Sequence, residues 1–194
     1  MNKTNREKVL AKIARIKENF AREKQLYGCI SDDGGWRYVI PGMLMDIMDL
    51  TAGKRYYTWF RKEFPDDGGE PNLYLSWLLL FYHRKEYETA VAMLKELIHA
   101  NIHVVPLILG KPMDKVAGFW YGSNLAEAGY VTIEESSRLS YLDEGFTTWL
   151  SEVYYSDIIQ YMVKKYIELR VELGRTHEIE QRRKILDEER RLFG

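Results

Sequence analysis

Cysteine and long apolar runs are the two features that this chain of 194 residues lacks most clearly. A single cysteine, Cys29, excludes an intramolecular disulfide and a cysteine-rich metal site, and it fits a reducing compartment. The longest apolar run, Trp77 to Tyr82, is far shorter than the ~20 residues that span a bilayer. The first residues lead into a charged stretch and lack the apolar core of a secretory signal. We therefore expect a cytoplasmic protein with no membrane partner.

An excess of charge of one sign is also missing. The formal net charge is −1, so a protein whose main partner is nucleic acid is not expected. The charge is unevenly distributed, because residues 1–27 hold 8 Lys/Arg against 3 Asp/Glu, which leaves −6 for the rest of the chain. This basic stretch either docks on the protein's own acidic body or contacts an acidic partner or surface.

An internal repeat is present. Asp32-Asp33-Gly34-Gly35 recurs 34 residues later as Asp66-Asp67-Gly68-Gly69. Each copy precedes an apolar segment, a short polar break and an amphipathic segment, which predicts two helix pairs. The expected helices of the first copy are 38–50 and 54–64, with a break at Thr51-Ala52-Gly53. Those of the second copy are 73–84 and 87–100.

The remaining segments also carry helical periodicity. Val9, Ile13, Ile16 and Phe20 recur every three or four residues, which predicts a helix over 4–26. Further helices are expected over 104–109, 124–140, 143–153, 156–173 and 177–193. Thr132 and Glu135 are spaced as a capping box, and Gly174 is taken to separate the last two helices. We predict one all-α domain over 1–194, with repeats at 33–102 and further helices over 103–194.

Residues 71–102 resemble a tetratricopeptide repeat, with Tyr87 and Ala90 at that motif's Tyr and Ala positions. A longer stretch, 33–150, resembles bacterial relatives of the suppressor-of-tumorigenicity family. The matching pieces are Asp33-Gly34-Gly35-Trp36-Arg37-Tyr38, Phe64-Pro65-Asp66-Asp67, Asn101 to Gly110, Gly122-Ser123, Glu127-Ala128, Tyr130 and Trp149-Leu150. The resemblance implies a right-handed stack of antiparallel helix pairs with extra N- and C-terminal helices. It implies no catalytic activity.

In such a stack the first helix of each pair lines a concave groove. The residues expected there are Tyr38, Met45, Asp49, Asn72, Leu79, Tyr82 and His83. The groove is either open to a partner or filled by the protein's own C-terminal helices. The leading hypothesis is a non-catalytic protein that binds a protein or peptide or acts as a scaffold. A homodimer through 4–26 and the stripe of Ile179, Leu186 and Phe193 is a further option.

The alternative hypothesis is an enzyme or small-ligand-binding protein with a pocket between the repeats and residues 111–155. The side chains expected to converge there are Trp120, Tyr121, Glu127, Tyr130 and Trp149. His99 and His103 share a helical spacing, but Ala100 stands where a zinc protease motif has Glu. We expect no metal site, no cofactor and no catalytic residue.

Overall fold

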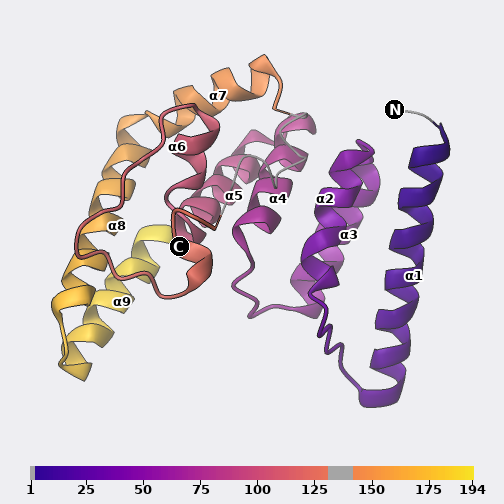
Figure 1. Ribbon diagram of the computed structural model, residues 1–194, viewed down its shortest axis with the longest axis horizontal. Helices are drawn as coiled ribbons and strands as arrows, with labels where there is room; N and C mark the ends of the chain where they lie inside the picture. Colours follow the sequence, from indigo (N-terminus) through magenta and orange to yellow (C-terminus); the bar gives the residue numbers. More distant parts are fainter. Residues whose placement is uncertain (1–2, 131–141) are drawn as a thin grey trace.

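The computed structural model describes residues 3–130 and 142–194, and within these two ranges all regular structure is helical (Figure 1). This confirms the predicted all-α class for the described part of the chain. The helices are α1 (Lys3–Tyr27), α2 (Trp36–Asp46), α3 (Leu50–Glu63), α4 (Pro71–His83), α5 (Tyr87–Ala100), α6 (Val104–Ile108), α7 (Glu144–Tyr154), α8 (Asp157–Arg175) and α9 (Ile179–Phe193), with a 3₁₀ turn η1 (Asn124–Ala126). None of these helices combines the length and the apolar character that a bilayer crossing needs.

Helix α4 is the centre of the molecule because it is apolar around its whole circumference. Ten of its 13 residues are buried, as expected for a helix surrounded by other elements. It packs on α2, α3 and α5. Helix α1 lies along α2 on one side and buries Ile13, Ile16 and Phe20, while α8 and α9 pack on α5 on the other (Figure 1).

The break inside the first helix pair lies before the position that the sequence predicts. Thr51, Ala52 and Gly53 are part of α3, and the chain turns at residues 47–49 instead. Met48 there has a φ of +49°, and the Asp49 carboxylate caps α3 by accepting a hydrogen bond from the Ala52 amide at 3.0 Å. The prediction of a break at Thr51–Gly53 is therefore wrong.

Two predictions in the C-terminal part also need correction. Gly174 lies inside α8, which continues to Arg175, so it does not separate two helices. In the described part of the helix predicted over 124–140, residues 124–126 form a 3₁₀ turn instead of an α-helix, and 127–130 are turn and bend. The rest of that predicted helix, including Thr132 and Glu135, lies outside the described residues.

Candidate functional site

Three of the seven residues predicted to line the groove lie in the protein interior or against α7, and a fourth, His83, contacts one of these three. Met45 is 2% exposed and Leu79 is fully buried. The Tyr82 ring lies edge-on to Phe146, at 5.0 Å between centroids, and contacts the neighbouring ring of His83. The Tyr82 ring is also 5.2 Å from that of Trp149, so α7 packs on this end of α4.

The other three groove residues take part in contacts within the protein. The Arg6 guanidinium donates to the Asp49 carboxylate at 2.8 Å and to the Ile47 carbonyl at 2.7 Å, so Asp49 connects α1 to the start of α3. Asn72 accepts a hydrogen bond from the Ser76 hydroxyl at its backbone carbonyl.

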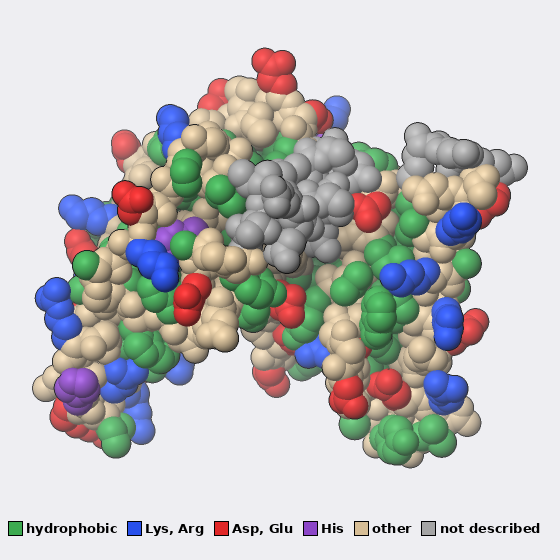
Figure 2. Space-filling model, viewed as in Figure 1, with side chains coloured by type: hydrophobic (Ala, Val, Ile, Leu, Met, Phe, Trp, Pro, Cys, Tyr) green, Lys and Arg blue, Asp and Glu red, His purple; other side chains and the backbone are tan. Residues whose placement is uncertain are grey.

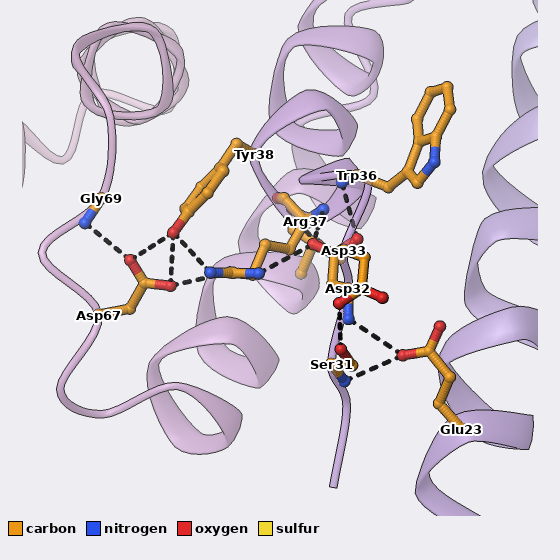
Figure 3. A network of polar contacts seen from close by, with 10 residues as sticks. Glu23, Ser31, Asp32, Asp33, Trp36, Arg37, Tyr38, Asp67 and Gly69 are labelled. Atoms are coloured by element: carbon orange, nitrogen blue, oxygen red, sulfur yellow. Dashed lines mark hydrogen bonds and ion pairs between the residues drawn. The ribbon is translucent and has the colours of Figure 1, made fainter. Parts of the chain in front are cut away.

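Tyr38 belongs to a polar network that joins the two Asp-Asp-Gly-Gly turns (Figure 3). Its hydroxyl donates to Asp67 at 2.8 Å and accepts from the Arg37 guanidinium at 2.7 Å. Arg37 itself donates to Asp67 at 2.8 Å and to Asp32 at 3.1 Å. Desolvation and the neighbouring Asp67 raise the pKa of Tyr38 to about 12, so this phenol keeps its proton at neutral pH. The network is a structural element that orients the two helix pairs.

The five side chains of the alternative pocket do not come together. Trp149 contacts Tyr82, while Tyr121 stacks on His103 at a centroid distance of 6.0 Å. Glu127 lies 3.8 Å from Lys115 at the surface. Of the other two, Trp120 lines a cavity beside α8, and Tyr130 lies in the 128–130 turn.

The two spaced histidines also go to separate places. His99 contacts Glu189 at 2.7 Å, and His103 is buried beside the Met113 carbonyl and the Tyr121 hydroxyl. Among the residues that the structure describes, no group of three His, Cys, Asp or Glu side chains is arranged to hold a metal ion.

A cleft of about 390 Å³ lies between α1 and α3. Its floor is aromatic, because Phe20 and Trp59 stack with their rings 5.9 Å apart and 12° from parallel. Phe20 is buried, whereas Trp59 stays partly exposed. The cleft is lined by Lys17, Phe20, Ala21, Lys24, Ile30, Arg55, Tyr56, Trp59 and Glu63.

The charges of this α1–α3 cleft are unbalanced. Lys24 pairs with Glu63 at one end. At the other end Lys17 lies over the Tyr56 ring, 5.3 Å from its centroid, and Arg55 lies near enough to repel it. Burial is the larger cause and repulsion from Arg55 the smaller one, and both lower the pKa of Lys17. Three cations thus surround one carboxylate, and among the described residues no anion pairs with Lys17 or Arg55. Figure 2 shows Lys and Arg side chains along the α1 limb.

The groove prediction did not include the α1–α3 cleft, although the sequence carries a signal for it. Lys17, Phe20 and Lys24 are spaced to share one side of a helix, as are Arg55 and Trp59. What the sequence does not show is that these two helical faces lie opposite one another. The chain matches no protein-family model, no curated protein and no solved structure.

Proposed function

We propose that the protein is a non-catalytic binding protein whose α1–α3 cleft takes up an acidic segment of a protein partner. The observation that carries this proposal is the pair of cations, Lys17 and Arg55, that face each other without an anion at the Phe20–Trp59 floor. A partner carboxylate between them replaces repulsion with two attractions.

The shape of the cleft favours a chain segment over a compact small molecule. Lys17 lies near Arg55, Phe20 stacks on Trp59 and Lys24 pairs with Glu63, so α1 and α3 run alongside each other in the same direction. Residues 17 and 24 are seven positions apart, which corresponds to about 10 Å of helix at 1.5 Å per residue. A short extended segment fits this length, with an acidic side chain at the Lys17 end and an apolar one over Trp59.

The helical framework is consistent with this role. Helix α4 packs on both helices of the preceding pair, α2 and α3, as well as on its own partner α5. This packing order supports the tetratricopeptide-like right-handed stack that we propose for residues 33–102, and such stacks present extended surfaces to partners. Because Met45 and Leu79 are buried, our proposal places the partner on the α1–α3 side rather than on the predicted groove.

The test is a fluorescence anisotropy titration with a labelled peptide of about ten residues that contains Glu, Asp, one Leu and one Phe. The reference peptide has Gln and Asn in place of every acid. We expect saturable binding of the acidic peptide only, weakening as salt is raised, because screening shortens the range of these charges to about 10 Å or less.

The matched variants separate the cleft from the general positive charge of α1. Lys17→Gln and Arg55→Gln remove the unpaired cations and are expected to weaken binding at least tenfold each. Arg15→Gln removes the same charge at an exposed position of α1 outside the cleft lining, and it should leave affinity nearly unchanged. Equal binding of both peptides, or an equal loss in the Arg15 variant, would rule the proposal out. Dimerisation that disappears in the Lys17 variant would show that a second copy, and not a foreign partner, occupies the cleft.

A further inference from the structure

A second cavity lies between segments that are far apart in the sequence. Its volume is about 220 Å³. The turn before α4 contributes Gly68 and Gly69, the end of α5 contributes His99, and α8 contributes Arg170. The loop of residues 119–126 closes the remaining side. This cavity is independent of the α1–α3 cleft, and none of its lining residues is shared with it.

The cavity has flat aromatic walls that are held in place by backbone contacts. Phe119 lies edge-on to Tyr166, with 5.8 Å between ring centroids, and Trp120 continues the same wall. The Trp120 amide donates to the Arg170 carbonyl of α8 at 3.1 Å. A Cβ on Gly174 would lie 2.5 Å from the Gly118 carbonyl oxygen, which shows how closely the loop approaches α8. The walls therefore form a pre-arranged site for an apolar group of limited size.

One guanidinium, that of Arg170, is fixed in the wall of this cavity. It lies over the rings of Trp120, at 5.3 Å, and Tyr166, at 5.1 Å. One terminal nitrogen donates to the buried Glu189 carboxylate at 2.7 Å. The Nε–H of Arg170 is buried and has no hydrogen-bond partner, and the same holds for the second oxygen of the Glu189 carboxylate, Oε2. The Arg170 side chain as a whole is 12% exposed. The other terminal nitrogen, Nη1, lies at the cavity lining, 3.5 Å from where a Cβ on Gly122 would be. A fixed guanidinium of this kind recognises a carboxylate through its N–H donors.

The local charge is compatible with one additional anion. A second guanidinium, that of Arg182, lies 5.3 Å from the Trp120 ring and donates to two carbonyls at the end of α8. Glu189 is the carboxylate that contacts Arg170, and it also contacts His99. Two arginines against one carboxylate leave a single positive charge beside the cavity. This suits a monoanion, whereas a phosphate dianion would leave excess charge against aromatic walls.

We propose that this cavity binds a small aromatic monocarboxylate, with its carboxylate on Arg170 and its flat apolar body along Phe119, Trp120 and Tyr166. Glu189 acts as a positioning residue that holds the guanidinium in its orientation. The cavity admits a single ring more readily than a fused system because of its volume. Nothing in this proposal requires a reaction, so the site is one of binding.

The experiment compares benzoate and phenylacetate with benzamide and phenylacetamide, which have the same shapes without the charge. Binding to the full chain is followed by ligand-observed NMR and isothermal titration calorimetry. We expect saturable binding of the acids, at least tenfold tighter than that of the amides. Absence of saturable binding by either acid, or equal binding of acids and amides, would overturn the proposal.

Three variants locate the binding. Arg170→Gln should weaken benzoate at least tenfold, whereas Arg175→Gln removes an exposed charge from the same helix outside the cavity lining and should change nothing. Ala126→Leu adds bulk to the cavity lining, leaves Arg170 unsubstituted and should block benzoate binding. This variant still tests the location of the site if Arg170→Gln fails to fold. Benzoate affinity that survives Ala126→Leu would place the ligand elsewhere and refute the site.

Discussion

Two adjacent aspartates, Asp32 and Asp33, are expected to differ sharply in what they contribute to stability. The Asp32 carboxylate is 1% exposed. It accepts hydrogen bonds at 2.8 Å from the backbone amides of Trp36 and Arg37, which are free donors at the start of α2. It also pairs with the Arg37 guanidinium at 3.1 Å. Asp33 is exposed, and its side chain contacts the Ser31 hydroxyl.

The perturbation is the same in both positions, Asp32→Asn and Asp33→Asn. Asparagine keeps the size of aspartate and tolerates the Asp32 φ of +49°, so backbone strain does not enter the comparison. At Asp32 the new NH₂ group faces donors, which leaves a buried donor without an acceptor and removes the charge opposite Arg37. We expect a loss of about 2–4 kcal/mol in the free energy of unfolding. At Asp33 we expect less than about 0.5 kcal/mol.

The assay is urea unfolding followed by far-UV circular dichroism, with the midpoint and the slope fitted separately. A lower midpoint at an unchanged slope identifies a true loss of native stability. The second turn offers an internal replicate in which the order is reversed. Asp67 accepts from Arg37, Tyr38 and the Gly69 amide, so Asp67→Asn should be costly and Asp66→Asn nearly neutral. If Asp33→Asn destabilised the protein as much as Asp32→Asn, the reasoning from the network would be refuted.

Three further predictions concern packing and pH. Leu79→Ala should cost about 2–5 kcal/mol in urea unfolding because the side chain is fully buried; a cost below about 1 kcal/mol would mean that it faces an open groove. Gly174→Ala should lower the free energy of unfolding and speed proteolysis of the adjacent loop, because the new Cβ would meet the Gly118 carbonyl oxygen at 2.5 Å. Gly68→Ala, with open space around it, is the neutral control. Equal destabilisation by the two substitutions would contradict this prediction. Burial lowers the pKa of His103 below the usual 6.5, so the unfolded chain binds the proton more readily than the folded protein. The free energy of unfolding should therefore fall as the pH drops below about 6.5. An NMR titration that gives His103 a pKa at or above 6.5 would contradict this prediction.

The helical class and most helix positions were predictable because they depend on local periodicity. The predicted helix 87–100 coincides with α5, and the predicted polar break at Lys85-Glu86 separates α4 from α5. The short segment after Asn101 is helical, as expected from the lack of a second strand to pair with it. In each case the apolar residues that predict a helix, and the polar residues that predict its end, lie within one helical turn of the element they predict.

The two misplaced boundaries share one physical cause, which is the interpretation of glycine as a helix break. Gly53 lies inside α3, where a Cβ would be 2.8 Å from the Leu80 side chain of α4. Gly174 lies inside α8 against the Gly118 carbonyl oxygen. Both glycines permit a close approach by a segment far away in the sequence. Such an approach leaves no local pattern, so a helix interior and a helix end look alike at these positions.

The candidate sites were less predictable than the fold for a related reason. The α1–α3 cleft requires two segments about 38 residues apart to lie side by side, as the separation of Lys17 and Arg55 shows. The cavity at Arg170 brings together four segments, and its polar partner Glu189 comes from α9. Periodicity identifies the faces of single helices, whereas these sites depend on which faces meet.

The contact that Arg37 makes between the two repeated turns cannot be repeated by the second copy. Arg37 belongs to the first copy and reaches forward to Asp67 of the second. The residue 34 positions after Arg37 is Pro71, which has no side-chain donor and begins α4 instead. The second copy therefore has no equivalent side chain that could bind the turn of a following helix pair. Arg37 occurs once and is not duplicated with the motif around it, so this linkage is limited to two turns. The helices that follow attach to the second pair through different contacts, among them the Tyr166 hydroxyl that donates to the His99 carbonyl and the contact of His99 with Glu189.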